Sequence, residues 1–181
     1  MKKIIMICFS LAVTIFIIPG CSKKKGCTDS ASNNYDKYAE VDDGSCTYKG
    51  CTDSAANNYD KNAQVDNGSC TYTAGEGGNV TIVAFPKHHG MFIVSDSLYL
   101  DSAFVKFNAT NSPGTTAGAY DKIVVGVAGE DHVHIEGLKR GKYFIFMTGY
   151  DSSISQRLTG GIPYEITQKS GEIDLDVPVT E

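Results

Sequence analysis

The chain has 181 residues, a formal net charge of −5, a hydrophobic fraction of 41% and six cysteines. An acidic chain has no electrostatic reason to bind nucleic acid, so nucleic-acid-binding proteins are excluded as a class. The length allows one ordinary domain together with something smaller.

The N-terminus is typical of an export signal. Two lysines precede an apolar run, residues 4–18, that is too short for a comfortable membrane span. A lone cysteine, Cys21, follows the run after Pro19 and Gly20. This position suits a lipoprotein. An uncleaved membrane anchor and an ordinary secretion signal are the alternatives, and neither requires a cysteine there.

The residues Ile-Pro-Gly-Cys at 18–21 resemble the lipobox of bacterial lipoproteins, in which the cysteine is acylated and becomes the new N-terminus. The resemblance implies that residues 1–20 are removed and that residues 21–25 form a lipidated tether. Acyl chains on Cys21 would hold the protein to a membrane of the cell envelope. Ser22, directly after this cysteine, suits sorting to the outer membrane. Two locations stay open there, the periplasmic face of that membrane and the cell surface.

Residues 26–49 and 50–73 align without a gap at an offset of 24 residues, with 19 of the 24 positions identical, and we take 26–49 and 50–72 as two copies of one repeat. Each copy has too few apolar residues to form a core. Each has two cysteines at the same spacing, which should oxidise outside the cytoplasm. Four cysteines allow three pairings, and a self-contained repeat favours Cys27–Cys46 and Cys51–Cys70.

Oxygen-bearing side chains crowd the first copy. Calcium prefers six to eight oxygens from carboxylates, amides and the backbone in a flexible loop, so this copy is a candidate calcium site. The same residue types form turns and Asx caps without any metal, and both interpretations stay open. In the second copy Asn67 replaces one acid, which weakens any calcium site there. The candidate calcium ligands are Asp29, Asn34, Asp36, Asp42 and Asp43.

The repeat begins Gly-Cys-Thr-Asp and ends Asp-Asp-Gly-Ser-Cys in its first copy. This pattern resembles a short module found, often in tandem, in secreted and surface proteins of bacteria related to the flavobacteria. The resemblance covers residues 26–72. It implies a spacer or extracellular module and brings no catalytic role.

Residues 73–78 are predicted to be a glycine-rich linker, and residues 79–181 to be a separate domain. That domain contains eight short runs rich in β-branched and aromatic residues, without a helical apolar stripe. The pattern predicts an all-β protein with a C-terminal antiparallel β-sandwich, Ig-like or prealbumin-like. The predicted strands are 80–85, 92–100, 103–109, 122–128, 132–138, 142–150, 163–168 and 172–179.

Leu138, Gly141 and Tyr143 lie at a turn between two predicted strands and resemble the corner of carboxypeptidase-regulatory-like and transthyretin-like sandwich domains. The resemblance covers about residues 130–179 and implies an accessory domain that binds, spaces or stiffens. The last two predicted strands would then form a hairpin. Val133, Ile135 and Leu138 precede the turn, with Val133 and Ile135 expected to face the core, and alternation places Tyr143, Ile145 and Met147 on one face of the next strand.

All four histidines lie in this domain, in two pairs. Strand alternation places His132 and His134 side by side on the outer face, about 7 Å apart. That spacing suits one copper or zinc ion, with Glu130 and Asp131 close by. A polar outer face without a metal explains the same pattern, and nothing in the sequence shows that the two pairs meet. The candidate copper or zinc ligands are His88, His89, His132 and His134.

The sequence contains no nucleophile elbow, zinc-protease motif or phosphate-binding loop, so we expect a non-catalytic protein. Our leading hypothesis is a lipid-anchored binding or structural module on a disulfide-closed stalk. One alternative is a periplasmic copper- or zinc-binding protein. Another is an accessory protein that binds a glycan or a protein partner through exposed aromatic side chains such as Tyr120 or Tyr150.

Overall fold

The computed structural model describes residues 22–181, so the predicted export signal and the predicted lipidation site, Cys21, lie outside the described residues. The chain divides after Tyr48 into two compact units, the second of which is Lys49–Glu181. The described part of the chain is all-β, with 47% of its residues in strands and 2% helical, which confirms the predicted fold class. Within the described residues, no helix has the length and apolarity needed to span a membrane.

Each repeat is a loop with one short pair of parallel strands. In the first copy, β1 (Lys25–Gly26) pairs with β2 (Val41–Asp42). In the second copy, β3 (Lys49–Gly50) pairs with β4 (Val65–Asp66) in the equivalent register. Turns and irregular segments make up the rest of each repeat, so the two copies share one local structure as their sequences predict.

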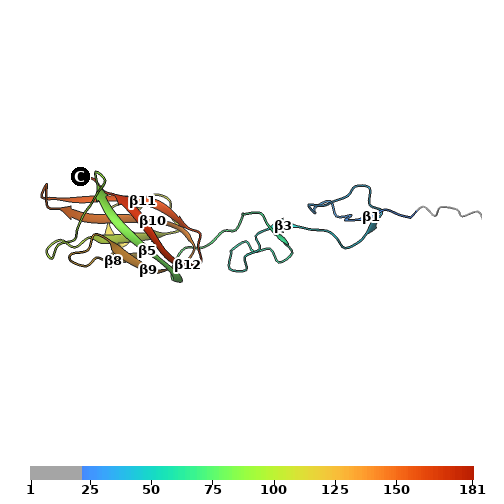
Figure 1. Ribbon diagram of the computed structural model, residues 1–181, viewed down its shortest axis with the longest axis horizontal. Coiled ribbons are helices and arrows are strands. Elements are labelled where there is room, and N and C mark those ends of the chain that lie inside the picture. The colour runs from blue at the N-terminus through green and yellow to red at the C-terminus, as the bar shows by residue number, and fades with distance from the viewer. Residues whose placement is uncertain (1–21) are drawn as a thin grey trace, which may run out of the picture. The chain divides into compact units, whose positions relative to one another are not determined.

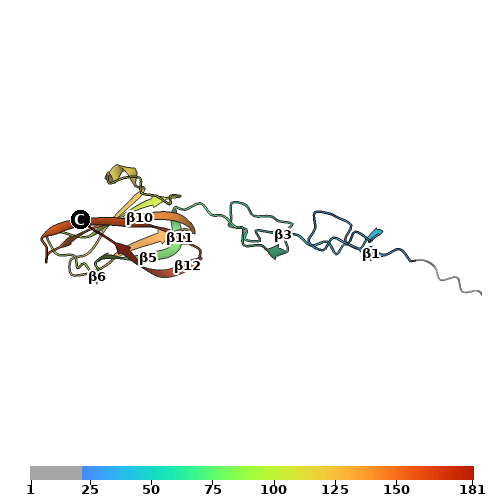
Figure 2. The same ribbon diagram turned by 90° about the horizontal axis from the view of Figure 1, so that it is seen from above.

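The C-terminal domain consists of two stacked sheets (Figures 1 and 2). The first sheet has the strand order β11-β10-β7-β8, and all neighbouring strands are antiparallel. Its strands are β7 (Ser102–Phe107), β8 (Lys122–Val125), β10 (Gly141–Asp151) and β11 (Gln156–Ile166), with the short 3₁₀ helix η1 (Ala117–Ala119) between β7 and β8.

The second sheet is built around β5 (Glu76–His88). On one side β5 pairs with β12 (Ser170–Pro178), and on the other with β9 (Val133–Leu138) and then β6 (Met91–Phe92). The pairing of β5 with β12 is parallel, whereas the other two pairings are antiparallel.

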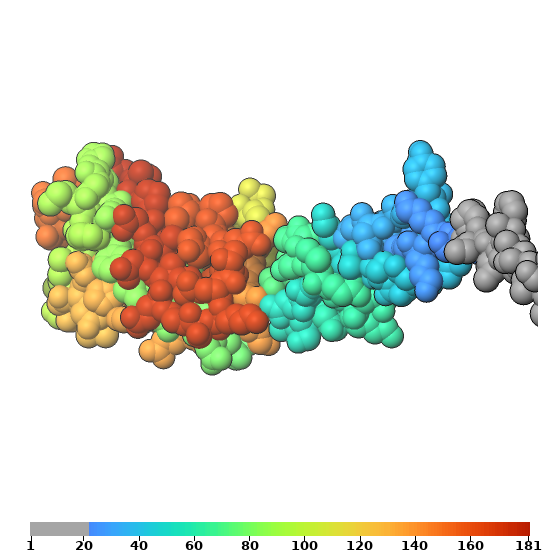
Figure 3. Space-filling view, turned by 45° about the vertical axis from the view of Figure 1, so that its right-hand side comes forward, coloured from blue at the N-terminus to red at the C-terminus, as the bar shows by residue number. Residues whose placement is uncertain are grey.

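The prediction of a hairpin between the last two strands is therefore wrong, because β11 and β12 lie in different sheets. After β11 the chain crosses to the other sheet, where β12 pairs in parallel with β5. The two strands are therefore not the antiparallel neighbours that a hairpin joins. The atoms of these C-terminal strands, drawn in red, cover one side of the sandwich in the space-filling view (Figure 3).

The core lies between the two sheets and includes the residues predicted to face it. β9 and β10 meet at the predicted corner, one strand from each sheet, and their alternate side chains point inward. Each of these side chains is at most 1% exposed, namely Val133, Ile135, Leu138, Tyr143, Ile145 and Met147.

A second, smaller apolar cluster covers the outer face of the first sheet. Phe144 and Phe146 alternate with the core residues of β10 and are still only 7% and 8% exposed. Tyr120, from the connection between β7 and β8, packs against Phe146 and donates a hydrogen bond to the carbonyl of Gly114 over 2.8 Å. Tyr120 is 8% exposed, so the prediction that it is an exposed aromatic is wrong.

The start of β5 lies within the predicted linker. β5 begins at Glu76, and a register shift there places both Glu76 and Val80 opposite Leu138. A Cβ atom on Gly78 would lie 2.0 Å from the carbonyl oxygen of Leu138, so only glycine allows this approach of the two backbones. Gly77 and Gly78, two of the three glycines that suggested a linker, therefore belong to the strand.

The predicted strand at 92–100 is mostly a loop, because β6 ends at Phe92. Asp96 accepts hydrogen bonds from the backbone N–H groups of Leu98 and Tyr99 over 2.7 and 2.8 Å, which forms a side-chain-capped turn. Leu98 is 82% exposed as a result.

Candidate functional site

Both predicted disulfides are present. Cys27 bonds to Cys46 and Cys51 to Cys70, each across 19 residues of sequence and with a Cα–Cα distance of 4.8 Å. Closing a loop of this size stabilises the folded repeat by about 3 kcal/mol in the chain-entropy description. The cysteines at the start of each repeat are 1% exposed, whereas the larger apolar side chains remain largely exposed, so the disulfide takes the place of a core.

The candidate calcium ligands of the first repeat serve as turn caps. Asp29, Asp36 and Asp42 each accept a hydrogen bond from a backbone N–H two residues further along, at 2.8 to 3.1 Å. Asn34 spans the loop, since its amide donates to the carbonyl of Ser45 over 2.6 Å and accepts from the backbone N–H of Thr47 over 2.8 Å. These contacts favour the interpretation in which the repeat needs these residues for its turns.

The two copies support that interpretation at the position where they differ. Asp43 accepts a hydrogen bond from the backbone N–H of Ser45 over 2.9 Å, and Asn67 accepts the equivalent bond from Ser69 over the same distance. An amide oxygen therefore replaces a carboxylate oxygen without loss of the turn. Within residues 22–181, no three His, Cys, Asp or Glu side chains are grouped so that they could hold a metal ion.

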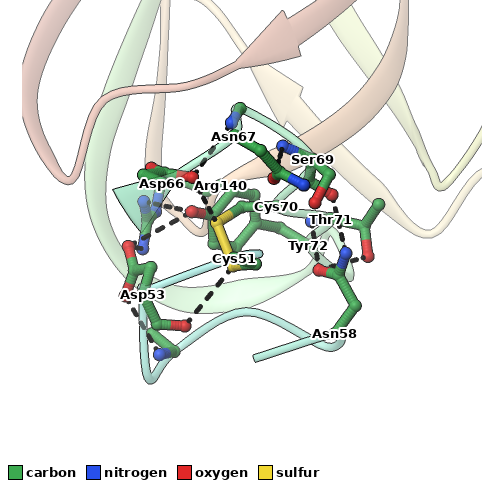
Figure 4. Close-up of a disulfide and its surroundings, with 12 residues drawn as sticks. Cys51, Asp53, Asn58, Asp66, Asn67, Ser69, Cys70, Thr71, Tyr72 and Arg140 are labelled. Atoms are coloured by element: carbon green, nitrogen blue, oxygen red, sulfur yellow. Dashed lines mark hydrogen bonds and ion pairs between the residues drawn. A yellow bond between two sulfur atoms is a disulfide. The ribbon is translucent and has the colours of Figure 1, made fainter. Parts of the chain in front are cut away.

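The second repeat makes a charged contact with the sandwich domain through Arg140, which lies in the turn between β9 and β10 (Figure 4). The guanidinium donates to Asp53 Oδ2 over 2.7 Å and to Tyr72 Oη over 2.8 Å. Its central carbon also lies 3.8 Å from the centroid of the Tyr72 ring. The hydrogen bonds from Ala55 N–H and Arg140 hold the pKa of Asp53 well below its usual range.

The chain after the second repeat is also attached to the sandwich. Tyr143 is fully buried, with its Oη 2.6 Å from the Lys139 carbonyl, and accepts a hydrogen bond from the backbone N–H of Gly75 over 3.0 Å. Asn108 accepts a hydrogen bond from the N–H of Ala74 over 2.8 Å. Residues 74–75 are thus fixed by hydrogen bonds to the domain that follows.

The two histidine pairs lie on opposite faces of the second sheet. His88 shares the inward face of β5 with Ile82 and Ala84 and is 8% exposed. His134, in contrast, alternates with buried residues of β9 and is exposed on the outer face, opposite Val83. His88 is five residues from Val83, about 17 Å along the strand. The structure therefore does not bring all four candidate ligands together, although it does bring His132 and His134 together.

A cleft of about 530 Å³ lies at the end of β5, and we call it the β5-end cleft. Apolar side chains of β6, of the segment after it and of the turn between β10 and β11 line it, and several of these are exposed, including Met91 at 73% and Val94 at 57%. Tyr150 also lines the cleft, and its ring stacks on that of Tyr99 with centroids 4.1 Å apart. The main lining residues are His88, His89, Met91, Phe92, Val94, Tyr150, Asp151, Ile154 and Glu181.

A charged group lies among these apolar side chains. His88 Nδ1 is 3.1 Å from Asp151 Oδ2, and the other oxygen of Asp151 accepts hydrogen bonds from the hydroxyl and backbone N–H of Ser153. The Ser153 hydroxyl, followed by His88, lowers the pKa of Asp151 to about 2. The ring of His89 stacks on the ring of His88, with the two centroids 4.1 Å apart. A cleft of this size with an apolar wall and a few fixed polar groups is typical of a ligand site.

Sequence reasoning did not find Arg140 or Asp101. An arginine before a turn glycine gives no sign of its partner when that partner is 87 residues away. Asp101 is 0% exposed, and neither of its carboxylate oxygens has a hydrogen-bond partner in the described part of the chain. Its position between two predicted strands gave no sign that its side chain is buried.

Comparisons with known proteins do not indicate a function for the chain. No protein-family model matches the chain, and no curated protein or solved structure is significantly similar to it.

Proposed function

We propose that this protein is a non-catalytic lipoprotein of the cell envelope that presents a binding cleft at the end of a sandwich domain. The acyl chains on Cys21 would anchor it, and the two repeats would act as a spacer between membrane and domain. The anchor rests on the basic, apolar and Ile-Pro-Gly-Cys segments at the N-terminus.

The observation that carries the proposal is the β5-end cleft. Met91, Val94 and Ile154 are 73%, 57% and 41% exposed around it, although a soluble domain normally buries side chains of this kind. Contiguous exposed apolar surface of a folded domain commonly marks a site for a partner. The aromatic ring of Tyr150 and the polar groups of Asp151 would suit a ligand with both apolar and hydroxyl-bearing faces, such as a glycan.

The spacer role is supported by the contents of the repeats. Each repeat has no core, but a disulfide closes it and its own side chains cap its turns. These contacts would let each repeat fold without a ligand. In the second repeat, Asp53 and Tyr72 contact Arg140 of the sandwich domain, so the contact residues of the repeat serve attachment.

The anchor is tested by metabolic labelling with a palmitate analogue and by cell fractionation. The wild-type chain should incorporate label and sediment with membranes, whereas Cys21→Ser should do neither. A Cys21→Ser protein that still incorporates label would remove the lipoprotein proposal.

The cleft is tested on a glycan array with the full chain purified in detergent. We expect binding to a restricted set of glycans, reduced about tenfold or more by Tyr150→Ala and by Ile154→Ser, because each removes contact surface from the wall. Ile123→Ser is the matched control, since Ile123 is 48% exposed on β8 and does not line the cleft. Absence of glycan binding, or equal loss in the control, would contradict glycan recognition by this cleft.

A further inference from the structure

His132 and His134 form a close pair on the outer face of β9. Val133 and Ile135 point into the core, which puts both imidazoles on the same side of the strand. Their Nε2 atoms lie 3.0 Å apart, much closer than the spacing of alternate residues along a strand. Two imidazole nitrogens at this separation can both reach one ion at the usual bond length of about 2.0–2.1 Å.

The ring of His132 is fixed on two sides. Asp131 Oδ1 lies 2.8 Å from Nδ1 of His132, and the ring of Phe85 packs against the imidazole with centroids 5.3 Å apart. When Asp131 accepts the proton of Nδ1, the lone pair of Nε2 is left to face His134. A carboxylate that holds the second nitrogen of a histidine in this way is the usual support of a metal-binding imidazole.

Glu130 is a third donor near the pair, but its side chain must turn to bind the same ion, because no three such side chains in residues 22–181 are placed to hold a metal ion as they stand. Its Oε2 atom is 3.9 Å from Nε2 of His132, and its side chain is 42% exposed and able to turn. The backbone beneath it is held in place, because the carbonyl of Glu130 accepts a hydrogen bond from Ser95 N–H over 2.8 Å and its N–H donates to Val127. The carboxylate can therefore adjust while its point of attachment stays fixed.

The donors select the class of ion. Two neutral imidazoles and one carboxylate suit copper or zinc, whereas calcium and magnesium prefer sites made of oxygen alone. Among first-row divalent ions, affinity for such a site is highest for copper. A hydrogen bond between the two imidazoles is the competing explanation of the 3.0 Å distance, and it would need no metal.

We propose that His132 and His134 bind one divalent transition-metal ion, copper more tightly than zinc, with Glu130 as a third ligand and Asp131 as a positioning residue. Water would fill the remaining coordination positions. The site lies on the outer face of the second sheet, none of its four residues lines the β5-end cleft, and the proposal does not depend on ligand binding there.

The experiment titrates Cu²⁺ and Zn²⁺ alone into the full chain, purified in detergent without a histidine tag and with its disulfides intact. Isothermal calorimetry gives the stoichiometry and affinity, and the electron paramagnetic resonance spectrum of Cu²⁺ counts the coordinated imidazoles. The variants are His132→Ala, His134→Gln and Glu130→Gln, with His89→Ala as a matched control that removes an imidazole elsewhere. His134→Gln keeps a polar side chain on an exposed position, so its fold should be retained.

We expect one ion per chain at micromolar concentration, with coupling from two nitrogens in the copper spectrum. Either histidine variant should weaken binding by about tenfold or more, and Glu130→Gln by a smaller factor, whereas His89→Ala should leave it unchanged. The proposal is overturned if neither metal binds below about 100 μM, which would leave a plain histidine–histidine hydrogen bond. It is also overturned if affinity persists in both histidine variants or falls equally in the control.

Discussion

Arg140 stacks on Tyr72, with the guanidinium carbon 3.8 Å from the ring centroid, and also donates a hydrogen bond to the hydroxyl of the same residue. The Arg140 side chain is 12% exposed and also pairs with Asp53. One side chain thus makes a stacking contact, a hydrogen bond and an ion pair with the second repeat, a combination that a lysine cannot reproduce.

Replacing Arg140 should loosen the second repeat from the sandwich domain. We expect Arg140→Ala, and to a lesser extent Arg140→Lys, to speed amide hydrogen exchange around Asp53 and at residues 71–75, with little change in the sandwich core. Lys169→Ala is the control, because Lys169 is 75% exposed and lies 3.5 Å from the same carboxylate. Equal exchange in Arg140→Ala and wild type would show that the contact contributes nothing to attachment.

Asp101 should make stability depend on pH. Burial raises its pKa from 3.8 to about 6, so the folded protein holds this proton more tightly than the unfolded chain does. The free energy of unfolding should therefore rise as pH falls from about 7 to about 4, and the contribution is lost as pH rises through about 6.

The substitution Asp101→Asn removes the buried charge. We expect it to raise the free energy of unfolding at pH 7 by about 1–3 kcal/mol and to flatten the pH dependence between pH 4 and 7, both measured by chemical denaturation. Asp96→Asn, in the neighbouring loop, should change neither quantity. A wild-type protein whose stability falls between pH 7 and pH 5 would contradict the assignment.

Removing one disulfide should unfold one repeat. In the variant Cys51→Ser/Cys70→Ser, the second repeat loses about 3 kcal/mol of loop-closure stabilisation and has no core to replace it. Limited proteolysis should then cut within residues 51–70, while the near-UV circular dichroism of the sandwich domain is retained. Simultaneous loss of that signal would mean that the sandwich needs the repeat in order to fold.

The turn function of the first repeat is tested by a pair of variants. Asp43→Asn copies the residue of the second repeat and should leave thermal stability unchanged, with or without calcium or a chelator. Asn34→Ala removes two hydrogen bonds to the backbone and should cost about 1–2 kcal/mol. If calcium stabilises the wild type and Asp43→Asn abolishes that effect, the calcium interpretation is correct and the turn interpretation is incomplete.

Local patterns in the sequence were enough to predict which side chains face inward. Alternation identified Val133 and Ile135 as core residues, and therefore the common face of His132 and His134, because strand geometry fixes these positions over two residues. The disulfides were also predictable, since each repeat had to be self-contained.

The strand pairing could not be predicted in the same way. Alternation in β12 predicts that Leu175 and Val177 are buried. The same alternation is expected whether the strand pairs with β11 or with β5, so it does not identify the partner. The 3.0 Å approach of the two imidazoles depends on Asp131 and Phe85, and Phe85 comes from a strand distant in the sequence. These features arise from tertiary packing, which periodicity does not encode.

The last residues of the chain link the two sheets. Val179 donates a hydrogen bond to the carbonyl of Lys87 on β5, and Thr180 exchanges two backbone hydrogen bonds of 2.9 Å with Thr159 on β11. Backbone groups that would otherwise stand unpaired at a sheet edge are thereby occupied by the chain itself. This closure occupies the outer edge of β11 and would hinder edge-to-edge association between neighbouring copies there, the route by which exposed strands nucleate aggregates.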